Sequence, residues 1–116
     1  MSHNQFKIFK GKQESIEDIK DHIESFVTEN RVSAKSIGIE FIERSREFMI
    51  SLGYNQTEEF TDVSIDLVNF GTIDLNDTAS IEQKMSEAAT AQQNVICHEL
   101  CITDKDEFMM IFMSTK

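Results

Sequence analysis

The segment "NVICHELCITDKDEFMMIFMSTK", residues 94–116, decides the fold of this chain. Within residues 97–101 it carries two cysteines, a histidine and a glutamate, so it is either a metal or redox site or a strand that bears thiols. Val, Ile, Leu, Cys and Thr predominate up to Asp104, a composition that favours a strand. We therefore predict two paired strands, residues 94–103 and 107–114, joined by a turn.

The alternation of side chains along a strand separates the candidate ligands from one another. Cys97 and Cys101 share one face, and His98 lies on the other. The two thiols are then about 13 Å apart along the strand, whereas the Cα atoms of a disulfide lie within about 7 Å. This spacing excludes a mutual disulfide and a shared metal ion, so we expect no metal and no cofactor. Each cysteine is expected to act as a small apolar residue.

Motifs of the common enzyme classes are missing from the chain. It has no glycine-rich phosphate loop, no G-x-S-x-G sequence and no H-E-x-x-H sequence. We predict no catalytic residues, and a binding protein is favoured over an enzyme.

Helical spacing of apolar residues marks two helices. Ile16, Ile19, Ile23, Phe26 and Val27 fall on one face of a predicted helix over residues 15–30, which Ser15 is expected to cap. A thinner apolar stripe predicts a second helix over residues 78–93, capped by Asp77 or Thr78.

Alternating apolar residues mark the remaining strands. We expect strands at residues 5–10 and 62–70, and a hairpin within residues 35–54. The predicted order is β-α-β-β-β-α-β-β in a single α+β domain, residues 1–116. We expect a two-layer fold, with a mostly antiparallel sheet of about six strands and both helices on one face.

The two halves of the chain share this pattern. "IEFIERSREFMISL" can be laid over "HELCITDKDEFMMIFM", with Glu40 over Glu99, Phe41 over Leu100 and Phe48 over Phe108. The overlay indicates either an internal duplication of a βαββ unit or two hairpins that obey the same strand rules.

The composition narrows the classes of partner. The formal charge is −10 and no basic cluster interrupts it, which disfavours nucleic acids and anionic membranes. No apolar run reaches the roughly 20 residues of a membrane helix, and no signal peptide is recognisable. Two unpaired cysteines suit a reducing compartment, so we expect a cytoplasmic protein. A basic protein partner would be attracted to it.

The last predicted strand, "EFMMIFM", is apolar on both faces and is therefore expected at the centre of a sheet. We expect the helices to cover the face that carries Ile96, Leu100 and Ile102. The opposite face is then a predicted partner interface, formed by Met49, Cys97, Cys101, Met109, Ile111 and Met113. The halves could close on each other over this face, a second copy could stack on it, or another protein or an apolar ligand could bind there.

Two hypotheses for function follow. The first is a non-enzymatic protein-interaction module, a small acidic protein of bacterial type that acts through this Met/Phe face and its acidic surface. Small acidic inhibitors and immunity proteins are comparable by analogy alone. The alternative is a small-ligand-binding domain or small enzyme with a cavity between sheet and helices near His98, with Glu40 and Glu99 as further residues to test.

Overall fold

The computed structural model describes residues 5–56 and 59–116, and it confirms the predicted order of elements in an α+β fold. The strands are β1 (Gln5–Lys12), β2 (Ser33–Ile42), β3 (Glu47–Asn55), β4 (Val63–Thr72), β5 (Val95–Ile102) and β6 (Glu107–Thr115). The helices are α1 (Ile16–Asn30), which follows a short 3-10 turn (Gln13–Ser15), and α2 (Thr78–Thr90).

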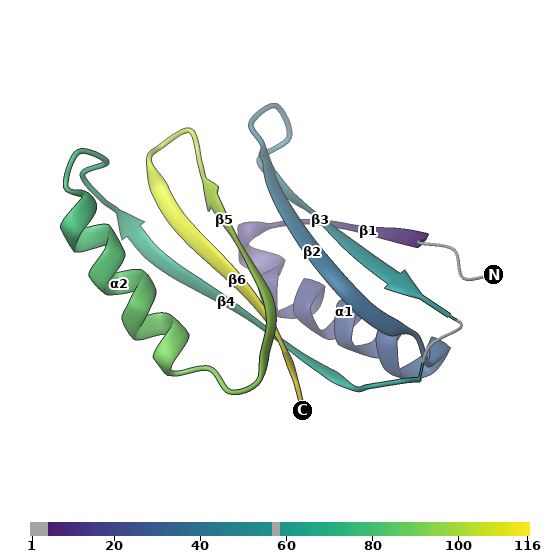
Figure 1. Cartoon of the computed structure of the whole chain (residues 1–116). Helices are drawn as coiled ribbons and strands as arrows, with labels where there is room; N and C mark the ends of the chain where they lie inside the picture. Colours follow the sequence, from purple (N-terminus) through teal and green to yellow (C-terminus); the bar gives the residue numbers. More distant parts are fainter. Residues whose placement is uncertain (1–4, 57–58) are drawn as a thin grey trace.

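The strands form two three-stranded antiparallel sheets rather than one six-stranded sheet. The N-terminal sheet has the order β1-β3-β2, and the C-terminal sheet has the order β4-β6-β5 (Figure 1). β2 and β5 lie side by side but form no ladder. The thiols of Cys97 and Cys101 lie near the backbone of Ile37 and Phe41 of β2.

Each half of the chain folds as the same unit. In both, a first strand is followed by a helix and then by a hairpin, and the last strand of the hairpin is the central strand of the sheet. The prediction that the last strand of the chain is central is therefore confirmed, since β6 pairs with both β4 and β5.

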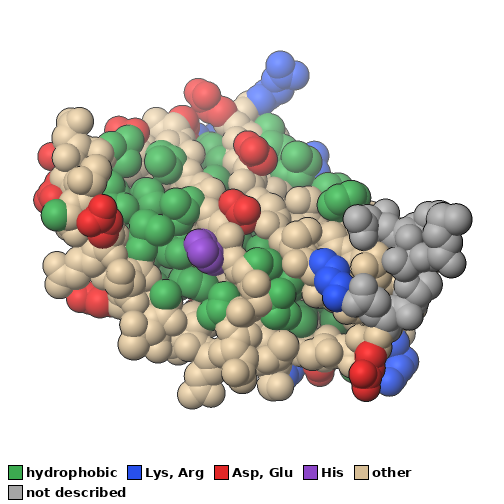
Figure 2. Space-filling view, viewed as in Figure 1, with side chains coloured by type: hydrophobic (Ala, Val, Ile, Leu, Met, Phe, Trp, Pro, Cys, Tyr) green, Lys and Arg blue, Asp and Glu red, His purple; other side chains and the backbone are tan. Residues whose placement is uncertain are grey.

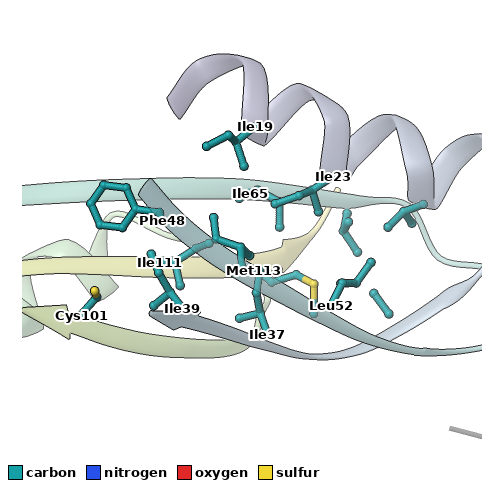
Figure 3. Packing of buried hydrophobic residues seen from close by; sticks show 14 of the residues in the cluster. Ile19, Ile23, Ile37, Ile39, Phe48, Leu52, Ile65, Cys101, Ile111 and Met113 are labelled. Carbon is teal, nitrogen blue, oxygen red and sulfur yellow. The ribbon is translucent and has the colours of Figure 1, made fainter. Parts of the chain in front are cut away.

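One hydrophobic core lies between the two sheets and α1. The inner faces of the sheets point toward each other, and α1 contacts both β1 and β4 (Figures 1 and 3). Glu24 and Thr28 of α1 also bind the C-terminal half: Glu24 Oε2 accepts a hydrogen bond from the Ile65 amide at 2.7 Å, and Thr28 Oγ1 donates to Asp62 Oδ1 at 2.8 Å. The core thus joins both halves.

The helix ends agree with the sequence in part. Ser15 occupies the position before α1, but its side chain makes no capping hydrogen bond. At α2, Asp77 caps the helix as predicted, since its side chain accepts a hydrogen bond from the Ser80 amide at 3.1 Å.

The two helices lie on different sides of the C-terminal sheet, and this corrects the expectation that both cover one face. α1 packs on the inner faces through Ile19, Ile23 and Val27, which are fully or almost fully buried. α2 lies over the outer face, and none of its residues is buried. The inner face of the C-terminal sheet is closed by the other half of the chain, so only its outer face is left for α2.

Candidate interaction surface

The residues predicted as a partner interface lie mainly in the core. Met109, Ile111, Met113 and Cys101 are buried, and Cys97 is half-buried against the same cluster. Met49 is half-buried on β3, between the core residues Phe48 and Ile50 and therefore on the other face of that strand. The two halves have closed over this face, so Cys97, Cys101, Met109, Ile111 and Met113 pack in the core rather than on an open surface, whereas Met49 lies outside it.

A shift of one residue in the overlay of the two halves explains this error. In the structure Phe41 packs on the core, as do Cys97 and Cys101, whereas Leu100, which the overlay matches to Phe41, is exposed. A shift of one residue moves every side chain of a strand to the opposite face. The face expected under the helices is therefore the exposed one.

Both thiols are held in their protonated form. Burial raises the pKa of Cys97, and its hydrogen bond with the Ile37 backbone only partly offsets this. Burial also raises the pKa of Cys101, helped by the negative charge of Glu40. Thiolates are the reactive and metal-binding form of cysteine. Within residues 5–56 and 59–116, no three His, Cys, Asp or Glu side chains come together as a metal site.

Exposed apolar side chains occur on β1 (Phe6 and Ile8), at Leu75, and as a group on the outer side of β5. We call the group on β5 the outer apolar face, and it consists of Val95, Ile96, Leu100 and Ile102, each 37–46% exposed. The last three of these are predicted from the sequence to lie on the covered side, and their exposure corrects that prediction. A warning signal was present in α2, whose thin apolar stripe supplies too few large side chains to cover a three-stranded sheet.

A cavity of about 270 Å³ lies beside this face, between α2 and the C-terminal sheet. We call it the α2 groove; it is lined by Met85, Ser86, Ala89, Val95, His98, Met110 and Phe112. His98 is the one titratable side chain in this lining, and its ring lies 6.3 Å from that of Phe112. Glu40 and Glu99 are exposed and do not line the groove. The three residues proposed for a ligand site are therefore not brought together.

Charge is distributed unequally between the two halves of the chain. Residues 1–57 hold eight basic and nine acidic side chains, whereas residues 58–116 hold three basic and twelve acidic ones. The formal charges of the two halves are thus −1 and −9. Figure 2 shows hydrophobic side chains gathered between α2 and β5, with acidic side chains around them. The apolar surface thus belongs to the strongly acidic half of the chain.

Comparison of the chain with protein-family models, curated proteins and solved structures found no match. Neither helix in the described part of the chain is long and apolar enough to cross a membrane.

Proposed function

We propose that the protein is a non-enzymatic interaction module that binds a protein partner through the α2 groove and the outer apolar face. The exposure of Leu100, at 41%, beside an open apolar cavity is the observation that carries the proposal. Each large apolar side chain left in water forgoes about 1.5–3 kcal/mol of burial, and contiguous patches of this kind mark binding sites.

The chemistry of the groove favours binding over catalysis. Enzyme sites bring several polar groups together around an apolar pocket, whereas His98 is the single titratable group in this lining. The raised pKa of both thiols also fits a protein that works without covalent chemistry, and free cysteines suit the cytoplasm, where thiols stay reduced.

A pair of matched substitutions tests the proposal. Leu100 and Leu75 are both 41% exposed, but Leu75 precedes α2 and does not line the groove. A partner captured by the wild-type protein, then purified, is titrated against Leu100→Gln and Leu75→Gln by calorimetry. We expect Leu100→Gln to weaken binding by about tenfold or more, the usual loss for an interface anchor, and Leu75→Gln to leave it unchanged. Equal affinities for the two variants would refute the proposal.

The cavity beside His98 supports a second candidate function, which is the binding of a small apolar ligand. Its volume of about 270 Å³ lies just below the range of drug-sized sites. Titration of the protein with a fatty acid, followed by the chemical shifts of the groove methionines Met85 and Met110, distinguishes this candidate. Saturable binding of the fatty acid that Leu100→Gln leaves intact, with no protein captured, would favour it.

A further inference from the structure

We infer that the partner segment is an amphipathic helix with a basic polar face, which lies beside α2 along β5. The inference rests on the proposed function and specifies its partner. It follows from the extent of the uncovered surface, from the covered edges of the strands, and from the charge of the C-terminal half.

The uncovered part of the C-terminal sheet is β5, since the outward side chains of β6 (Phe108, Met110 and Phe112) are only 1–4% exposed. α2 lies toward the β4 side of the sheet (Figure 1). A helix with its side chains is about 10 Å wide and neighbouring strands are about 4.8 Å apart, so one helix covers about two strands. Ile96, Leu100 and Ile102 of β5 remain exposed because α2 does not reach them. β5 has eight residues, a length of roughly 26 Å, which a helix of about 17 residues spans.

The strand edges beneath this surface exclude the addition of another strand. A peptide that extends a sheet needs a free backbone edge. One edge of β5 pairs with β6, and its other edge lies against β2. β6 is central and has no free edge. A partner must therefore bind through side chains packed on the face, which is how an amphipathic helix binds in a groove.

Charge complementarity selects a basic partner over a second copy of the chain. The half that carries the groove has a formal charge of −9. Glu82 and Glu87 on α2 outnumber its one basic residue, Lys84. Stacking two such faces would bring like charges together, whereas Lys and Arg on a partner helix would be attracted. The flexible side chains of Met85 and Met110 suit the groove to a Leu or Phe anchor.

Synthetic peptides test the inference. The probe is a 17-residue peptide of Leu and Lys with its leucines at helical spacing, and one control has Glu in place of every Lys. A second control has the composition of the probe, with Leu and Lys alternating at strand spacing. Binding of the labelled peptides to the whole protein is measured by fluorescence anisotropy, and their helix content by circular dichroism.

We expect the helical Leu/Lys probe alone to bind tightly, to gain helix on binding, and to bind less tightly in raised salt. We expect Leu100→Gln to weaken its binding by about tenfold and Leu75→Gln to leave it unchanged. Equal binding of the Glu peptide would overturn the basic partner, and better binding of the alternating peptide would overturn the helix. Equal effects of the two substitutions would show non-specific attraction and overturn the site.

A second copy of the chain is a separate outcome. If light scattering shows a dimer that Leu100→Gln dissociates, the occupant is another copy and the inference is wrong. If no peptide binds but a purified partner still distinguishes Leu100→Gln from Leu75→Gln, the inference fails while the proposed function stands.

Discussion

At the scale of single residues, burial decides what the two cysteines do. Their spacing in the sequence is close to that of redox and metal motifs, yet the strand geometry predicted that they act separately, as apolar residues. The structure places both against the backbone of β2. The sequence pattern predicts the strand β5. It does not predict that the face with the thiols is the buried one, because that depends on how the N-terminal half of the chain packs against β5.

The raised pKa values of the thiols give a prediction for their reactivity. In the native protein at pH 8, both cysteines should react slowly with Ellman's reagent, since burial raises the pKa of each above its ordinary value. Cys101 is buried and Cys97 half-buried, so the Cys97→Ala variant should react roughly tenfold more slowly than Cys101→Ala. Fast reaction of Cys101 without denaturant would contradict this arrangement.

At the scale of elements, the sequence predicts the strands well and their faces poorly. β6 is apolar on both faces, so its own pattern cannot show which face is inner. β5 alternates Cys97, Glu99 and Cys101 with larger apolar residues, and hydrophobicity alone places the larger ones inside. The structure does the reverse: Cys101 is buried and Cys97 half-buried against the core, whereas Ile96, Leu100 and Ile102 are exposed. α1 was predictable because its apolar stripe is wide and one-sided. The candidate interaction surface exists because α2 covers only part of the outer face of the C-terminal sheet, and this partial coverage is visible only in the assembled fold.

Two isoleucines on the hairpin of β5 and β6 test the assignment of faces. Ile111 is fully buried and Ile102 is 46% exposed. Ile111→Ala should lower the free energy of unfolding by about 2–5 kcal/mol. Ile102→Ala should lower it by about 1 kcal/mol or less. Urea unfolding followed by circular dichroism measures both values. A larger loss for Ile102→Ala would mean that the faces of the C-terminal sheet are assigned the wrong way round.

At the scale of the whole molecule, one ion pair joins the turns of the two hairpins. Arg46 Nη1 donates to both carboxylate oxygens of Asp104, at 2.6 and 2.7 Å, and the guanidinium lies 4.9 Å from the centre of the Phe41 ring. The hydrogen bond from Arg46 lowers the pKa of Asp104, and the same contact raises the pKa of Arg46. The pair connects the halves where β2 and β5 share no ladder.

The sign of this shift fixes the pH range in which the pair stabilises the fold. Because the pKa of Asp104 is lower in the folded state, its contribution is present above the unfolded value of 3.8 and is lost as the pH falls through the folded value. Asp104→Asn should therefore reduce stability slightly at pH 7, and the difference from the wild type should vanish near pH 2. Urea unfolding at both pH values checks this. Asp106→Asn is the control, since Asp106 lies in the same turn without this pairing. A difference that persists at pH 2 would assign the effect to another interaction.

The seam between β2 and β5 has a consequence for how the molecule is assembled. Every ladder among the described strands begins and ends within one half. A break in the chain between β3 and β4 would therefore cut no sheet, and the pieces would meet as two subunits meet, through a buried apolar boundary with a few polar contacts at its margin. The two halves of this single polypeptide therefore pack against each other as the two subunits of a heterodimer do, although one continuous chain connects them.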